Sequence, residues 1–236
     1  ALFSSNDLVA YSLEGHLLWL RGLTLDYPNA SNSLGMSSSP VIADGVLVVQ
    51  IENDSESYAL GIDPSNGQNL WRLDRPKAAN WTSPTVSSDD EGAVVFLQSS
   101  RGITAVRARD GSILDEYADG AATIPSSVLA DGELFVPSHG ITSLRWNGQS
   151  NRLEQTWRAG RFRPGTASPL VIEDQVFIVN GVGVVTCASR GDGARLWQLR
   201  LDGPFSATPV ATATHLYLVN EDGVAQVVSI QGGEGE

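Results

Sequence analysis

The sequence is short of several residue types that would identify a chemistry. Cys187 is the only cysteine in 236 residues, which excludes an intrachain disulfide and a Cys-x-x-Cys metal or redox site. Lysine and arginine are scarce, with 15 against 27 aspartates and glutamates, so the formal charge is −12. Because nucleic-acid backbones are bound by clustered cations, this balance argues against a nucleic-acid partner. Apolar runs are far shorter than the roughly 20 residues of a membrane span, and no span is expected.

What the sequence does contain is a repeat of about 40 residues. A small residue, then proline, then an apolar strand recurs four times, and a fifth copy has serine in place of the proline. These anchor positions are 44, 43, 42 and 40 residues apart. They are Pro40, Pro84, Ser127, Pro169 and Pro209. Such regular spacing indicates one supersecondary unit copied along the chain.

Each repeat contains four short apolar segments separated by tight-turn sequences. Asp44-Gly45 and Asp131-Gly132 carry the dipeptide that two-residue type I′ hairpins favour. Four antiparallel strands per repeat are typical of a propeller blade, whereas a helical solenoid would not place turns so frequently. We therefore predict an all-β fold: a β-propeller of four-stranded antiparallel blades, with about six blades' worth in this chain.

We expect a single β-propeller domain over residues 1–236, divided at the anchors. It consists of a partial blade (1–23), four whole blades (37–73, 81–118, 122–158 and 165–201), a second partial blade (205–230) and a tail (231–236). Two arrangements fit the partial blades. Either they combine to close a roughly six-bladed ring, or the chain is a piece of a larger ring. The second is favoured, because nothing at the beginning of the sequence resembles a start.

The fourth segment of each repeat carries an aromatic residue. A large flat side chain on an outer strand can dock against the neighbouring blade and bury on the order of 150–250 Å². We assign this structural docking role to Trp19, Trp71, Tyr117, Trp157 and Trp197.

The combination of a Ser-Pro-Val start, an Asp-Gly turn and a Gly-x-x-Leu-Trp end resembles the repeat of PQQ-like (quinoprotein dehydrogenase-like) propellers. Residues 59–71 are the clearest copy, and 10–19 and 188–197 are similar. Most known members are eight-bladed and exported. The resemblance therefore implies a fragment of an eight-bladed propeller in the periplasm or outside the cell, with no signal peptide in this chain. The family includes PQQ-dependent dehydrogenases and non-enzymatic members similar to the lipoprotein scaffold of the outer-membrane assembly machine.

The residues favour the non-enzymatic branch. The alcohol dehydrogenases of this family carry an adjacent cysteine pair, whereas Cys187 stands alone and is expected to be a small core residue. No set of Glu, Asn and Asp matches the calcium-binding motif of the family. We therefore expect no cofactor, no metal and no catalytic residue. The alternative is an oxidoreductase that depends on PQQ and Ca²⁺, or a fragment of one, whose ligands lie on blades outside this chain.

Other potential sites have simpler interpretations. His16, His139 and His215 are unrelated in spacing and are expected to be isolated surface residues rather than a metal site. The acidic run Glu52-Asn53-Asp54 lacks the spacing of a calcium-binding EF-hand loop, and we interpret it as a solvated turn.

Binding is expected on one face of the blades. The loop that enters the first strand and the loop between the second and third strands lie on the same face, and longer, varied loops usually carry binding. The candidate ligand-binding residues there are Asn80, Trp81, Arg101, His139, Arg161, Arg163 and Phe205. Lys77 and the three arginines place scarce positive charge on this face. The alternative is that the residues of this face fill the central channel or face water without binding a ligand. We expect a binding or scaffold propeller that presents this face to a protein or small ligand; a sensor or carbohydrate-binding domain is the weaker alternative.

Overall fold

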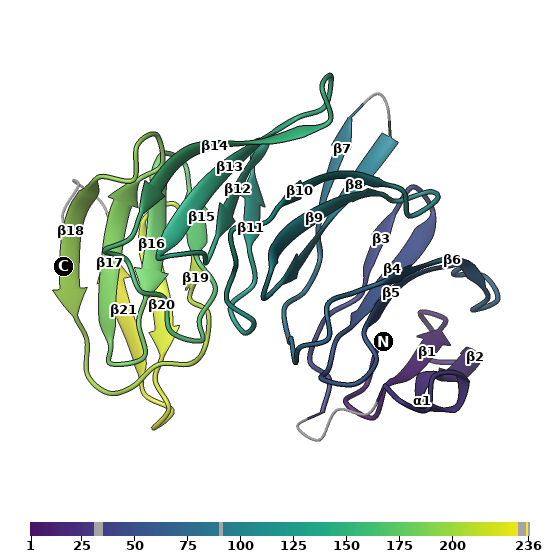
Figure 1. The fold of residues 1–236 in the computed structure, drawn as a ribbon. Coiled ribbons are helices and arrows are strands. Elements are labelled where there is room, and N and C mark those ends of the chain that lie inside the picture. The colour runs from purple at the N-terminus through teal and green to yellow at the C-terminus, as the bar shows by residue number, and fades with distance from the viewer. Residues whose placement is uncertain (31–34, 90–91, 231–234, 236) are drawn as a thin grey trace. The chain divides into compact units, whose positions relative to one another are not determined.

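The computed structural model describes residues 1–30, 35–89, 92–230 and 235, and within them the chain is all-β (Figure 1). The one helical segment there is α1 (Leu23–Asp26), a single turn far too short to cross a membrane. The strands form six antiparallel sheets, and neighbours within each sheet are consecutive in the chain. This is the meander of a propeller blade, so the fold class predicted from the repeat is confirmed.

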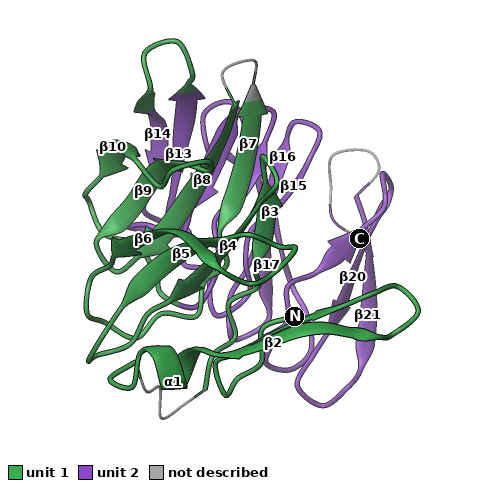
Figure 2. Ribbon diagram, turned by 90° about the vertical axis from the view of Figure 1, so that its right-hand side faces the viewer, with its two compact units in different colours: residues 1–123, 147–153 green, residues 124–146, 154–236 purple. Residues whose placement is uncertain are grey.

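The first of two compact units comprises residues 1–123 and 147–153 (Figure 2). Its two-stranded sheet contains β1 (Asp7–Tyr11) and β2 (Leu17–Gly22). One four-stranded sheet contains β3 (Val41–Ala43), β4 (Val46–Ile51), β5 (Tyr58–Ile62) and β6 (Asn69–Asp74). The other contains β7 (Thr85–Asp89), β8 (Gly92–Ser99), β9 (Gly102–Arg107) and β10 (Ile113–Tyr117).

The second unit comprises residues 124–146 and 154–236. Its first sheet contains β11 (Val128–Ala130), β12 (Glu133–Val136), β13 (Ile141–Asn147) and β14 (Arg152–Ala159), of which Asn147, Arg152 and Leu153 are grouped with the first unit. Its second contains β15 (Leu170–Ile172), β16 (Gln175–Val179), β17 (Val184–Ser189) and β18 (Arg195–Arg200). Its third contains β19 (Val210–Ala211), β20 (His215–Val219) and β21 (Ala225–Ser229). The predicted tail, 231–236, lies outside the described residues except for Gly235. The single-domain organisation stays a prediction.

The anchor of the repeat is explained by hydrogen bonds between consecutive blades. The backbone N–H of Ser39 donates to Ser83 Oγ at 2.9 Å. In the second unit Ser126 donates in the same way to Ser168 Oγ, and Ser168 to Thr208 Oγ1, both at 2.9 Å. Each acceptor is the small residue directly before the next anchor position. A hydroxyl is needed there because a smaller apolar side chain could not accept the bond.

Several inner strands are buried along almost their whole length. Every residue of β5 and β12 is buried, and β8 and β9 each have a single residue, at one end, that is not buried. Strands covered on both faces read as continuous apolar runs rather than as an alternation of apolar and polar residues. β20 instead alternates between buried residues and residues that are not buried.

Trp71 on β6 is packed between two glycines. Its cross-strand partner is Gly61 on β5, where a Cβ would come within 2.1 Å of the indole. Against the ring lies Gly111, in the β9–β10 turn of the next blade, where a Cβ would come within 2.6 Å. The indole N–H donates to the Ala108 carbonyl of that blade at 2.8 Å, and Trp71 is only 8% exposed.

Two other tryptophans make the same pair of contacts. The indole N–H of Trp19 donates to the Pro64 carbonyl at 2.8 Å, and that of Trp157 donates to the Arg190 carbonyl at 2.7 Å. Their rings lie against the turn glycines of the next blade, Gly67 and Gly193 respectively. In these three blades the outer strand thus offers its neighbour a hydrogen-bond donor and a flat aromatic surface.

The blade that carries Tyr117 is linked differently. Its outer strand uses Asp115, whose carboxylate accepts from the Leu153 N–H at 2.7 Å and from Arg152 Nη1 at 3.2 Å. Tyr117 itself donates to Asp119 at 3.5 Å. The docking roles assigned from the sequence stay predictions, and the one at Trp71 is carried into an experiment in the Discussion.

The residue opposite a docking tryptophan is small. Ala10 faces Trp19, and Cys187 faces Trp197 across the β17–β18 pair. Cys187 is completely buried, as expected for a small core residue. Burial raises the pKa of its thiol to about 12, so the thiol stays protonated at neutral pH and is a poor nucleophile.

Candidate functional site

A buried arginine organises the loop edge of the first unit. Arg75 directly follows β6, and its side chain is 3% exposed. Its Nε donates to Glu52 Oε1 at 2.7 Å. Its Nη1 donates to Thr104 Oγ1 at 2.7 Å, and its Nη2 donates to the Leu97 carbonyl at 3.1 Å. The guanidinium is therefore fixed by its own blade and by β8 and β9 of the next blade.

The carboxylate of Glu52 is satisfied on its other oxygen as well. Asn80 Nδ2 donates to Glu52 Oε2 at 2.9 Å and lies 2.8 Å from the Gln98 carbonyl. Glu52 is 1% exposed and Asn80 is 2% exposed. An isolated β-bridge between these two residues joins the β4–β5 loop to the β6–β7 connection. The cost of burying a charge pair is offset when further hydrogen bonds satisfy its remaining donors and acceptors, as they do for Glu52 and Arg75.

Two opposing effects act on this carboxyl. Burial raises the pKa of Glu52, because the charged form loses its hydration. The charge and hydrogen bond of Arg75, followed by the amides of Asn80 and Gln50, act in the opposite direction. The ionised state of Glu52 therefore depends mainly on Arg75.

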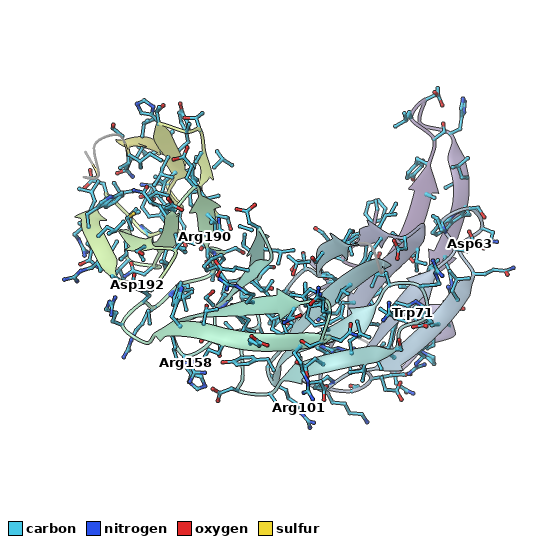
Figure 3. All side chains as sticks on the ribbon, turned by 90° about the horizontal axis from the view of Figure 1, so that it is seen from above. Asp63, Trp71, Arg101, Arg158, Arg190 and Asp192 are labelled. Carbon is cyan, nitrogen blue, oxygen red and sulfur yellow. The ribbon has the colours of Figure 1, made fainter. Side chains whose placement is uncertain are left out.

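A pocket of about 580 Å³, the first pocket, opens beside Arg75. Ligand sites typically have volumes of about 300–1,000 Å³. Its charged rim carries the exposed Lys77 and Arg101 together with Asp74 and Glu116. Its apolar wall includes Leu73, Ile103, Ile113 and Tyr117. Arg101, labelled in Figure 3, is thus a predicted site residue that the structure places on a pocket.

A smaller pocket, the second pocket, occupies the corresponding position in the second unit. Its volume is about 170 Å³. It is lined by Arg161, Phe162, Arg163, Asn180, Thr186 and Arg195, among others. Arg161 stands four residues after Trp157, as Arg75 stands four residues after Trp71. Two of the predicted site residues, Arg161 and Arg163, therefore line the second pocket together. Arg101 lines the first pocket.

The remaining predicted site residues are distributed more widely. Trp81 is half-buried and is held by its indole N–H, which donates to the Gly35 carbonyl at 3.0 Å. His139 is exposed in the β12–β13 turn at a φ of 47°. Phe205 is 1% exposed and packs in an apolar cluster with Val185 and Leu218. Phe205, like Asn80, thus lies inside the protein. The ligand-binding role of all these residues stays a prediction.

The interpretation of Glu52 and Asn53 as a solvated turn is wrong. Both are buried, at 1% and 2% exposure. Asn53 shapes the turn itself, since its Oδ1 accepts from the N–H groups of Ser55 and Glu56 at 2.8 and 3.0 Å. Arg75 was not among the predicted site residues. Its position four residues after a docking tryptophan, shared with Arg161, was the available indication.

Among the residues that the structure describes, no three or more His, Cys, Asp or Glu side chains lie close enough together to hold a metal ion. His215 instead shares a hydrogen bond of 2.8 Å between its Nδ1 and Thr214 Oγ1. The absence of a cofactor stays a prediction, and no catalytic step is derived from the described residues.

Four-stranded meanders joined by anchor hydroxyls and tryptophan docking define a PQQ-like β-propeller. A family model described as "Outer membrane protein assembly factor BamB" matches residues 2–139 and 143–236. The chain therefore belongs to the BamB family of PQQ-like propellers. No curated protein matches the sequence.

Solved structures show the same fold. BamB from Moraxella catarrhalis superposes with a TM-score of 0.72 at 18% identity, covering 97% of this chain and 66% of that one. The computationally designed Ika8 protein gives 0.65 at 14% identity, covering 96% and 66%. The designed Ika4 protein gives 0.53 at 14% identity, covering 70% and 99%. The chain thus spans 66% of the length of the first two proteins.

Proposed function

We propose that this chain is a non-enzymatic binding propeller that contributes to outer-membrane protein assembly, the role in the name of its family. It presents the loop edge of its blades to a protein partner or small ligand and works without a cofactor. The proposal includes export from the bacterial cytoplasm to the periplasm. The family match over nearly the whole chain supports the process, and the first pocket supports the binding edge.

The observation that carries the binding proposal is the hydrogen-bonded base of the first pocket. Its buried arginine is held by Glu52, Thr104 and the Leu97 carbonyl, so the exposed Lys77 and Arg101 project from a fixed base. Side chains held on rigid elements bind with less loss of conformational entropy than side chains on free loops. The arrangement of Lys77 and Arg101 beside Asp74 and Glu116 also favours one partner orientation over others.

Deletion of the gene in the source bacterium is expected to lower the amount of folded outer-membrane protein, and the wild-type gene is expected to restore it. Lys77→Glu/Arg101→Glu should restore less than about a tenth of the deficit, because reversing two charges at a binding edge opposes the partner's charges. The measurement is the folded outer-membrane protein in membrane fractions, with the level of each variant confirmed by immunoblot.

Arg109→Glu/Arg200→Glu is the matched control, since both residues are exposed and neither lines a pocket described above. It should restore the wild-type level. An unchanged amount of outer-membrane protein after deletion would contradict the assembly role. Full restoration by Lys77→Glu/Arg101→Glu would leave that role intact and contradict the binding edge.

The alternative, an oxidoreductase dependent on PQQ and Ca²⁺, has a direct test. After PQQ and Ca²⁺ are added to the purified protein, reduction of an artificial electron acceptor by alcohols or glucose should stay at the protein-free rate. A reduction rate that rises with PQQ would contradict the non-enzymatic proposal.

A further inference from the structure

The two pockets are copies of one repeat position and can be compared residue by residue. Arg75 and Arg161 each follow a docking tryptophan by four residues, and Lys77 and Arg163 by six. Thr104 and Thr186 each precede the next docking glycine by seven residues and line their pockets. Where the side chains at equivalent positions differ, the two pockets are therefore expected to bind different ligands.

The carboxylates around the first pocket have no acidic counterparts around the second. Glu52 follows the turn glycine Gly45 by seven residues, and the residue seven after Gly132 is a histidine. Glu116 pairs across the strands with Thr104, whereas the residue that pairs with Thr186 is a glutamine. The three replacements are Glu52 by His139, Asp74 by Gly160 and Glu116 by Gln198.

The second pocket keeps two cations of the first, has Gly183 at the position of Arg101, and gains one new cation. Arg161 and Arg163 correspond to Arg75 and Lys77, and Arg195 stands two residues after the docking glycine, where the first pocket has Ile113. In an acidic protein with 15 basic residues, three arginines on one pocket are a concentration of positive charge.

These arginines are only partly engaged within the protein. Arg161 donates from Nη2 to the Gly193 carbonyl at 2.5 Å and lies 4.7 Å from the Phe162 ring centroid. Among the described residues, the side chains of Arg163 and Arg195 have no hydrogen bond or ion pair, and both residues are exposed. The carboxylate of Asp192 in the neighbouring turn accepts from the Ala194 N–H at 3.0 Å; this bond lowers its pKa, and the charge of Arg161 does so more weakly. By contrast, three acceptors fix Arg75.

We propose that the second pocket binds a carboxylate supplied from outside the chain, namely an acidic side chain on a segment of a protein partner. The precedent is internal: at the equivalent position the protein already holds a carboxylate, that of Glu52, against an arginine. Planar guanidinium groups match the two oxygens of a carboxylate. The inference deepens the proposed function, on which it rests for the protein source of the carboxylate.

The size of the second pocket agrees with this ligand class. About 170 Å³ is below the range of whole-cofactor sites but admits a carboxylate with its methylene groups. The charge of −12 opposes non-specific binding of an acidic segment, since the protein as a whole repels it. Binding of an acidic peptide would therefore have to come from a local cluster of cations.

The test uses a fluorescent oligo-glutamate peptide and its oligo-glutamine counterpart, measured by anisotropy with the whole chain at about 0.15 M salt. The wild type should bind the glutamate peptide at least about tenfold more tightly than the glutamine peptide, because charge-assisted hydrogen bonds form only with the first. Arg163→Gln/Arg195→Gln should weaken glutamate binding by about tenfold or more. Arg109→Gln/Arg200→Gln, with the same change in net charge, should change it by less than about twofold.

The outcomes separate the pocket from its ligand and from the proposed function. No preference of the wild type for glutamate, or equal weakening by the two double variants, would overturn the site. Competition by inorganic phosphate that is stronger than competition by glutarate would overturn the carboxylate assignment. Glutarate that binds as tightly as the peptide would keep the carboxylate site but overturn the protein source. Any of these results leaves the gene-deletion experiment unaffected, so the two proposals can fail separately.

Discussion

Trp71→Ala is expected to lower the free energy of unfolding of the first unit by about 3–5 kcal/mol, the usual cost of truncating a buried aromatic to alanine. The loss has two physical parts. The indole is 8% exposed and fills the space between Gly61 and Gly111, so its removal leaves a cavity between two blades. The Ala108 carbonyl also loses the donor that it accepts from at 2.8 Å. Urea denaturation followed by circular dichroism measures the change.

Leu70→Ala is the matched control, because Leu70 is the neighbouring residue on β6 and is 55% exposed. Its cost should stay within about 1 kcal/mol, as at most exposed positions. A loss at Trp71 as small as this would contradict the docking role.

A second variant tests the contact from the other blade. Gly111 has a φ of 71° and would carry a Cβ 2.6 Å from the Trp71 ring, so Gly111→Ala combines backbone strain with a clash. In the Trp71→Ala background the clash is absent and only the strain remains. Gly111→Ala should therefore cost less there than in the wild type, which is the non-additivity expected of residues in contact.

The fold could be predicted from the sequence because its determinants are local and repeated. The Asp44-Gly45 turn indicated a type I′ hairpin, and both residues indeed have positive φ values, 49° and 72°. The spacing of the anchors placed the strands, and the structure adds the reason, a hydroxyl such as that of Ser83 that accepts from the preceding blade. Five copies of one pattern made each of these local indications stronger.

The candidate site could be predicted only in part, because burial is decided between blades. Glu52 in an acidic loop gave no indication of a partner, since Arg75 is 23 residues away in sequence and Thr104 lies on the following blade. Phe205 was placed on a loop correctly, but its packing against Val185 and Leu218 depends on the strands around it. Exposed cations such as Arg101, Arg161 and Arg163 were easier to recognise, because neither burial nor pairing conceals them.

Arg75→Met is expected to lower the free energy of unfolding by about 3–5 kcal/mol at neutral pH, because it leaves the buried carboxylate of Glu52 without its counter-ion. Methionine retains most of the apolar length of the arginine, so the loss of packing is small. Arg72→Met is the matched control: Arg72 lies on β6, three residues before Arg75, its side chain is 34% exposed, and it pairs with Glu56 and Asp74 at 3.0 Å. Exposed ion pairs contribute about 0–1 kcal/mol.

The cost of Arg75→Met should rise with pH. Burial already raises the pKa of Glu52, and removal of Arg75 leaves that effect with less opposition. A carboxyl whose pKa is raised by folding contributes stability below its unfolded pKa, about 4.3, and loses that contribution as the pH rises through the folded value. The difference in stability between Arg75→Met and the wild type should therefore be smallest near pH 5 and largest near pH 8, in urea denaturations at about 0.15 M salt.

Adding Glu52→Gln to Arg75→Met removes the titrating group and gives the decisive comparison. The double variant should show no such rise with pH and should be more stable than Arg75→Met at neutral pH, because a neutral amide is less costly to bury than an unpaired charge. A double variant less stable than Arg75→Met across the pH range, or a cost of Arg75→Met that does not change with pH, would show that Arg75 stabilises the loop edge through packing alone. The fixed base of the first pocket would then not depend on the Glu52–Arg75 charge pair.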